Sequence, residues 1–293
     1  MKYELIHRTR YLYEGSVTVS HHLARLAPRH LPGQRCPWHE LEIHPVPVGR
    51  GVHADAFGNI TTYFEIEGSH EELEVIARSL VEVSKMDHPA PADTPPWEAV
   101  RDACHAQKLT PCAEAGAFRF ASPMVPLGKD FSHYALPDFP AGRPVLEAVN
   151  ALMGRIHREF KFDTVATDVA TPVADVLRNK AGVCQDFAHL MLACLRSLGL
   201  SARYVSGYLE TAPPPGQKRL TGADASHAWV SVYCGEKAGW IDADPTNNVL
   251  PGERHITVAW GRDFSDVSPL RGVTLGAGGQ TLRVAVDVIP VGD

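Results

Sequence analysis

The stretch AGVCQDFAHLMLACLRSLGL, residues 181–200, predicts a buried helix that begins at a cysteine. Apolar residues recur along it at the spacing of one helix face: Phe187, Leu190, Met191, Cys194, Leu195 and Leu198. Such a continuous stripe is typical of a helix packed on a core, and Gly199 favours a helix end just after it. Cys184 precedes Phe187 by one turn, so we expect its side chain on the same inward face.

A cysteine in the first turn of a helix has chemistry that a cysteine in the middle of a helix lacks. The first N–H groups of a helix have no partner within it, and the helix dipole is positive there. A thiol in such a place has its pKa lowered from about 8.5 toward neutral, especially beside an imidazolium, and the same N–H groups can hold an oxyanion. Cys184 is therefore the candidate nucleophile, with an inert buried cysteine as the alternative. Cys194 is expected to belong to the core.

A thiolate nucleophile needs a base, and the base needs an acceptor that orients it. Two later segments supply candidates. In DASHAWVSVYCG, His227 begins an alternating strand, and in EKAGWIDADPTNN, Asp242 and Asp244 end another strand. Neighbouring antiparallel strands can bring such a histidine and aspartate into hydrogen-bond reach. The alternation does not choose between the two aspartates, because residues two apart face the same side of a strand.

Taken in order, GVCQDFAHL, ARYVSGY, SHAWVSVY and GWIDADPTN resemble the transglutaminase-like superfamily, and specifically its bacterial branch described as cysteine proteases. The resemblance implies a papain-like triad, which by motif is Cys184, His227 and Asp244. It extends to the β-rich start, RTRYLYEGSVTVSHHLARLAPR, and to HITVAWGRDFSDVSPLRGV near the other end. It further implies acyl transfer on a peptide or isopeptide amide through a thioester, with no cofactor and no metal.

The chain as a whole is expected to be α+β. Residues 1–83 read as an N-terminal antiparallel β-sandwich-like module, because YELIHRTRYLY and the segments after it alternate at period two. Residues 84–142 form a connecting or docking segment rich in Pro and Ala. Residues 143–293 form a papain-like, transglutaminase-like catalytic domain in which helices precede an antiparallel sheet. The alternating tail around residues 282–288 predicts one further strand as a C-terminal extension.

Three residues near the proposed nucleophile and base are candidates for supporting roles. Asp186 is expected to cap the start of its own helix rather than bind substrate. Gln185, beside the nucleophile, is a candidate for orienting substrate, and Tyr208 in the VSGY segment is a candidate for reaching the site. His189 lies off the apolar stripe, and we expect it to make a structural hydrogen bond, for example to the N-terminal module.

The aromatic and acidic residues around the proposed base have structural alternatives. Trp229 and Trp240 flank the proposed histidine and aspartate and are expected to be core aromatics that shield the triad from water. Asp242 and Asp244 together suggest a divalent metal, but no other carboxylate is spaced to complete such a site. We therefore predict no metal.

The composition of the chain limits the classes of molecule that are expected to bind it. The chain has 293 residues, a net charge of −6 and no cluster of Lys and Arg, so nucleic acid and anionic membranes are poor candidates. A peptide or protein amide is the expected substrate, and the oligomeric state stays open. No run of about 18 apolar residues and no signal-peptide pattern is found, so a cytoplasmic enzyme is expected. The cysteines form no C-x-x-C pair; they are Cys36, Cys104, Cys112, Cys184, Cys194 and Cys234.

The triad does not fix the outcome of the reaction. Water as the second reactant gives a protease or amidase, which is the expected activity, and an amine gives a protein-glutamine transglutaminase. A non-catalytic peptide-binding module on the same fold is an alternative of another class. The presence of all three residue types argues against that alternative.

Overall fold

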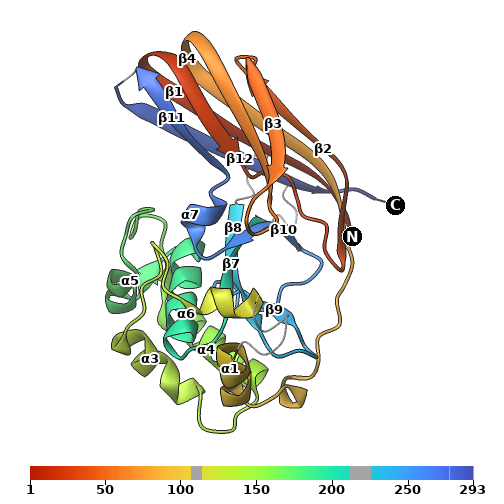
Figure 1. Ribbon diagram of the computed structural model, residues 1–293, viewed down its shortest axis with the longest axis vertical. Coiled ribbons are helices and arrows are strands. Elements are labelled where there is room, and N and C mark those ends of the chain that lie inside the picture. Colours follow the sequence, from red (N-terminus) through yellow and green to blue (C-terminus); the bar gives the residue numbers. More distant parts are fainter. Residues whose placement is uncertain (107–113, 212–225, 277, 293) are drawn as a thin grey trace, which may run out of the picture.

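Figure 1 shows a computed structural model of the chain, which describes residues 1–106, 114–211, 226–276 and 278–292. A long twisted β-sheet forms one end of the molecule, and a lobe of helices around a smaller sheet forms the other (Figure 1). Cys112 lies outside the described residues. No helix within the described ranges is long and apolar enough to span a membrane.

Both ends of the chain build the long sheet. Its strands are β1 (Lys2–Ala24), β2 (Gln34–His44), β3 (Gly49–Ala54), β4 (Ile60–Val83), β11 (Leu270–Gly276) and β12 (Gln280–Pro290). β1 pairs antiparallel with β4 on one side and with β11 and β12 on the other, while β2 and β3 pair with β4. The strand predicted around residues 282–288 therefore exists, but it extends the N-terminal sheet. The described strands of this module form one sheet instead of two facing sheets.

The alternation predicted for β1 is confirmed, because Tyr3, Leu5, His7 and Thr9 are all buried. Tyr3 and Leu5 belong to the same apolar cluster as the core of the helical lobe, whereas the far half of the sheet has a separate core that includes Val17. The N-terminal sheet is thus packed directly on the lobe through one of its ends.

The lobe is built mainly from helices. They are η1 (Pro91–Asp93), α1 (Trp97–Ala106), η2 (Ala117–Arg119), α3 (Lys129–Ala135), η3 (Leu136–Asp138), α4 (Val145–Glu159), α5 (Val173–Asn179), α6 (Cys184–Ser197) and α7 (Phe264–Val267). A short parallel pair, β5 (Lys161–Phe162) and β6 (Ala181–Gly182), leads into α6. The helix predicted from its cysteine start is α6.

The smaller sheet is antiparallel, in the order β10 (His255–Gly261), β7 (Ala202–Leu209), β8 (Ser226–Tyr233) and β9 (Trp240–Ala243). α6 packs on β7 and β8 and is also covered by α3, α4 and α5. Every residue from Asp186 to Arg196 is buried, so the apolar stripe marks only part of the buried surface. His189 does make a structural hydrogen bond, but its Nε2 accepts from the Phe264 N–H at 3.2 Å, in α7.

Candidate active site

Cys184 is the first residue of α6, and Val183 is the N-cap. Cys184 is partly exposed, whereas the other described cysteines are buried: Cys36, Cys104, Cys194 and Cys234. The helix start is fixed by Asp186, whose Oδ2 accepts from the Val183 N–H at 2.8 Å and from the Thr167 hydroxyl at 2.6 Å. Asp186 therefore caps its helix, as predicted.

The residue before the N-cap has to be small. A Cβ atom on Gly182 would lie 2.7 Å from Asp186 Oδ2 and 2.9 Å from Asp186 Cβ. The carboxylate that caps the helix folds back into the space that a side chain at Gly182 would fill. The sequence Gly182-Val183-Cys184 thus allows the Asp186 cap, which positions the thiol.

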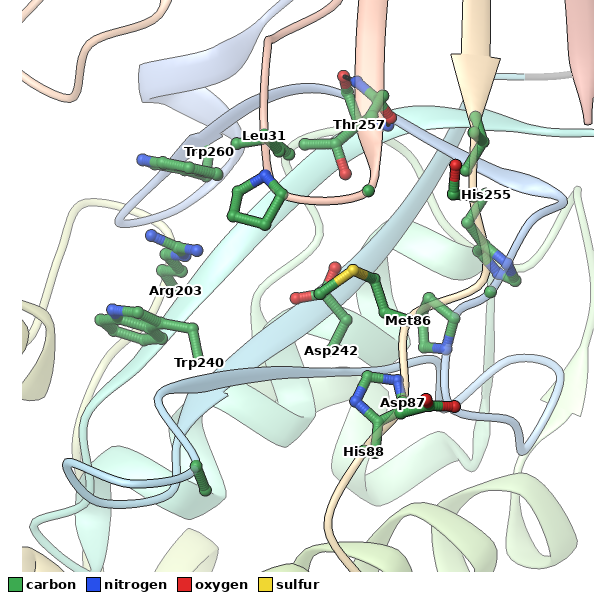
Figure 2. A pocket seen from close by; sticks show the side chains of 18 of the residues that line it. Leu31, Met86, Asp87, His88, Arg203, Trp240, Asp242, His255, Thr257 and Trp260 are labelled. Atoms are coloured by element: carbon green, nitrogen blue, oxygen red, sulfur yellow. Dashed lines mark hydrogen bonds between the residues drawn. The ribbon is translucent and has the colours of Figure 1, made fainter.

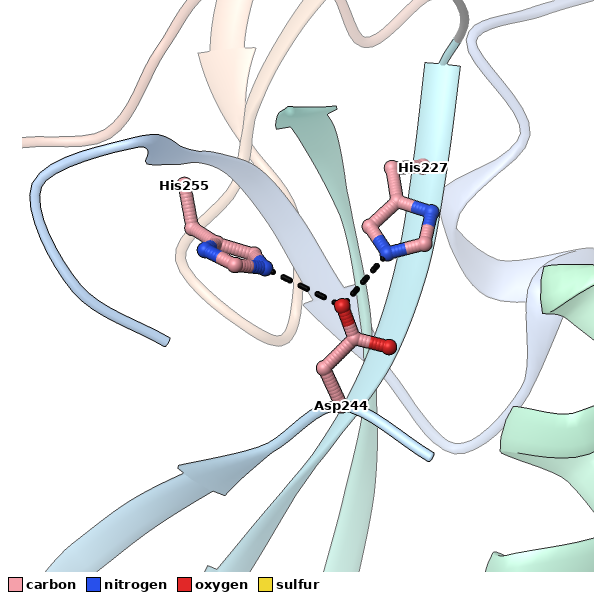
Figure 3. A group of neighbouring side chains, drawn as sticks. All are labelled: His227, Asp244 and His255. Carbon is pink, nitrogen blue, oxygen red and sulfur yellow. Dashed lines mark hydrogen bonds and ion pairs between the residues drawn. The ribbon is translucent and has the colours of Figure 1, made fainter. Parts of the chain in front are cut away.

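His227 in β8 and Asp244, which directly follows β9, meet at the end of the smaller sheet, which we call the catalytic sheet (Figure 3). His227 Nε2 lies 2.8 Å from Asp244 Oδ2. The ring is 9% exposed and the carboxylate is fully buried. Figure 3 shows Nδ1 on the side of the ring turned away from Asp244, which leaves that nitrogen for a second partner.

Cys184 interacts with the same imidazole and contributes to its ionisation. Burial lowers the pKa of His227, but hydrogen bonds to Asp244 and Cys184, together with the charges of both groups, raise it from 6.5 to about 9. His227 is therefore an imidazolium at neutral pH, in contact with a thiol on one side and a carboxylate on the other. An imidazolium beside a cysteine stabilises the thiolate form.

Asp244 is held by more groups than the motif suggests. Its Oδ2 accepts from His255 Nε2 at 3.1 Å and from Asn247 Nδ2 at 2.7 Å, besides His227. Its Oδ1 accepts from the backbone N–H groups of Thr246 at 2.9 Å and Asn247 at 3.2 Å. Burial alone raises the pKa of Asp244, but the bonds from His227, His255 and Asn247 outweigh it and hold the pKa well below its usual range. The carboxylate stays ionised.

Two members of this network, His255 and Asn247, were not predicted. Asn247 follows the DPT segment directly, in the turn that wraps Asp244, so an Asx-type turn was a readable signal. His255 begins β10, which reaches Asp244 only because β10 pairs with the far side of β7. No local sequence pattern predicts the contact between His255 and Asp244.

The group formed by His227, Asp244 and His255 has ligand atoms within 4.8 Å of one another, close enough to hold a metal ion. Both imidazoles already point an Nε2 at one carboxylate oxygen. The Asn247 amide nitrogen lies 3.3 Å from His227 Nε2, in the same space. A nitrogen donor there suits an anion better than a cation, so the geometry is that of a hydrogen-bond network around Asp244.

Asp242 and Trp229 support the network from the same sheet. Trp229 is fully buried and its Nε1–H donates to Asp242 Oδ2 at 2.9 Å. Its ring centre lies 6.0 Å from that of His227 and 5.3 Å from that of His255. Trp229 therefore shields the imidazoles, and the structure separates Asp242, which binds the indole, from Asp244, which binds the base.

The remaining predicted residues make their contacts outside the Cys184, His227 and Asp244 group. Tyr208 is buried and its hydroxyl is 2.9 Å from His7 Nδ1, so it ties the catalytic sheet to β1. Trp240 packs against Tyr233 and stacks on Arg203. Gln185 donates to the Val169 carbonyl at 3.4 Å, beside the nucleophile.

Two family models match the chain. Residues 3–82 match the bacterial transglutaminase-like N-terminal region, and residues 139–245 match the transglutaminase-like superfamily. The chain belongs to the transglutaminase-like superfamily, in its bacterial form that carries this N-terminal region. An uncharacterised protein of Mycobacterium tuberculosis is 40% identical over 296 residues, covering 99% of this chain and 93% of its own.

Two further comparisons concern the whole fold and a shorter part of the chain. The crystal structure of "a Putative Cysteine Protease from Cytophaga hutchinsonii" has a TM-score of 0.75 and 19% identity, over 100% of this chain and 92% of its own. That similarity shows that the whole fold is shared, including the arrangement of the long sheet on the lobe. A protein-glutamine gamma-glutamyltransferase of Pseudomonas aeruginosa is 37% identical over 109 residues, covering 34% of this chain and 16% of its own.

Proposed function

We propose that the protein is a cysteine hydrolase that cleaves peptide or isopeptide amides through a thioester. The observation that carries the proposal is the hydrogen-bonded series from Cys184 through His227 to Asp244. A nucleophile at a helix start, a base in contact with it and a buried carboxylate on the far nitrogen are the three roles that such catalysis needs.

Each residue then has a defined step. The Cys184 thiolate attacks the amide carbonyl carbon, and N–H groups at the start of α6 stabilise the oxyanion. His227 gives its proton to the departing amine, which leaves a thioester on Cys184. A water molecule, deprotonated by His227, attacks the thioester and releases a carboxylic acid and the thiol. Asp244 holds the imidazole in orientation and stabilises its charged form throughout.

The second reactant separates two candidate activities. Water is favoured here because a structural relative that matches the full length of the chain is titled "a Putative Cysteine Protease". An amine is the alternative, because the Pseudomonas aeruginosa relative, which matches a third of the chain, is a protein-glutamine gamma-glutamyltransferase. Both share the first half of the reaction.

One incubation separates these activities. The protein and a Cys184→Ala control are incubated with casein and a fluorescent primary amine, and the products are read by mass spectrometry. The proposal predicts new peptide termini without attached amine, and none with the control. Amine attached to casein glutamine would establish the transglutaminase instead. If neither product forms in a wider peptide library, the peptide-binding alternative gains support.

A further inference from the structure

A second site lies on the catalytic sheet, apart from the triad. It is a cavity of about 560 Å³ (Figure 2). Its walls come from the strands β7, β9 and β10, the turn between β1 and β2, and the segment after β4. This volume is in the usual range for a small-molecule site. Cys184 and His227 are not among the described residues that line it, whereas His255 lines it and also bonds Asp244.

One wall of the cavity carries a guanidinium group without a polar partner. Arg203 lies between two indole rings, 4.2 Å from the centre of Trp240 and 3.6 Å from the centre of Trp260 (Figure 2). Its Nε is buried and unbonded, and the described part of the chain offers the guanidinium no hydrogen bond or ion pair. By contrast, buried Arg196 donates to the carbonyls of Ala202 and Arg262.

The stacking defines where a ligand can bind Arg203. The indoles cover both faces of the planar guanidinium, so only its N–H edge remains for a partner, and a planar carboxylate matches that edge. Burial lowers the pKa of Arg203 to about 10, against the opposing effect of Asp242, so the group is a cation at neutral pH. The Asp242 carboxylate is already engaged by the Trp229 indole.

We propose that this cavity binds a small organic monocarboxylate, whose carboxylate takes the N–H edge of Arg203 and whose apolar body lies along Trp240 and Met86. Asp87, Glu114 and Asp242 also line the cavity and disfavour a second negative charge on the ligand. The same chemistry is presented by a free organic acid and by the carboxyl end of a peptide. The site needs no turnover at Cys184, so the proposal stands apart from the hydrolase function.

A matched ligand series tests the proposal on the full chain carrying Cys184→Ala, which cannot turn the ligands over. N-acetylphenylalanine, its amide and phenylalaninamide are acidic, neutral and cationic compounds that share the phenylalanine side chain, and calorimetry and tryptophan fluorescence report binding. The proposal predicts that the acid binds at least about tenfold more tightly than the neutral amide and that the cation binds least. Phenylacetate in parallel distinguishes a free acid from a peptide terminus as the better ligand.

Equal binding of acid and amide, tighter binding of the cation, or no binding of any member would overturn the proposal. Arg203→Lys keeps the positive charge but loses the planar N–H edge of the guanidinium, so it should remove the preference for the acid. Arg271→Lys, at an exposed position, should keep it. If Arg203→Lys does not fold, as judged by circular dichroism, the ligand series alone decides.

Discussion

His255 and Asp244 are joined by a hydrogen bond of 3.1 Å, and its acceptor is the same carboxylate oxygen that binds His227. Two imidazoles therefore converge on one buried anion (Figure 3). One of them faces the proposed nucleophile, and the other forms part of a cavity wall. We therefore expect His255 to be a positioning residue for the proposed triad, acting through Asp244.

Replacing His255 by Phe should weaken catalysis without removing it. Asp244 loses one hydrogen-bond donor, so it orients His227 less firmly. The kcat should therefore fall roughly tenfold, with little change in KM. The acid limb of the pH–rate profile should move upward, because the lost bond helped to keep the Asp244 pKa low. His255→Gln, which retains a donor, should recover part of both effects. An unchanged acid limb in His255→Phe would contradict the positioning role.

The two aspartates give a matched pair of variants. Asp244→Asn removes the carboxylate that raises the pKa of His227, so that pKa should fall from about 9 toward or below 6.5, because burial then dominates. Asp242→Asn changes the group that bonds Trp229, which is not among those that shift the His227 pKa, and should leave that pKa close to 9. NMR titration of the His227 ring measures both. Equal shifts in the two variants would show that Asp244 has no special relation to the base.

Stability should depend on pH through His227. Its pKa is raised from 6.5 to about 9 on folding, so its contribution is fully present below pH 6.5 and is lost as pH rises through 9. The loss should reach roughly 3 kcal/mol, from about 1.4 kcal/mol per pKa unit. Urea unfolding at pH 6, 7.5 and 9 should show the wild type losing stability relative to His227→Gln across this window. A constant difference between the two proteins would refute the raised pKa.

Gly182→Ala should disturb the nucleophile from outside the triad. The new Cβ would meet the Asp186 carboxylate, which must leave the Val183 N–H, so the start of α6 should loosen at a cost of about 1 kcal/mol. Alkylation of Cys184 should slow as well. Gly252→Ala is the control, because nothing lies within 4 Å of its added Cβ. Similar labelling rates in the two variants would argue that the cap does not position the thiol.

The sequence was most informative where chemistry depends on local order. The helix start at Cys184, the strand position of His227 and the Asp244-Pro245 step lie within short segments whose pattern is readable. The choice of Asp244 over Asp242 came from the family motif and not from strand alternation, because both residues face one way.

Features made by pairing of distant segments were not readable. β12 looks like any alternating strand, and nothing in its residues says that it joins β1 across the length of the chain. His255 reaches Asp244 through the pairing of β10 with β7. Tyr208 was placed on the right strand, yet its hydroxyl binds His7 of the other module. Such contacts depend on tertiary packing, which residue periodicity does not encode.

The central claim is that His227 activates the sulfur of Cys184, and site-resolved alkylation tests it most directly. Iodoacetamide is applied at pH 7, and the rate at each cysteine is read by mass spectrometry. Cys194 and Cys234 serve as internal references, because burial raises the pKa of each to about 12. The account predicts that Cys184 reacts far faster than these two and that His227→Ala slows Cys184 alone. A Cys184 rate that His227→Ala leaves unchanged would contradict it.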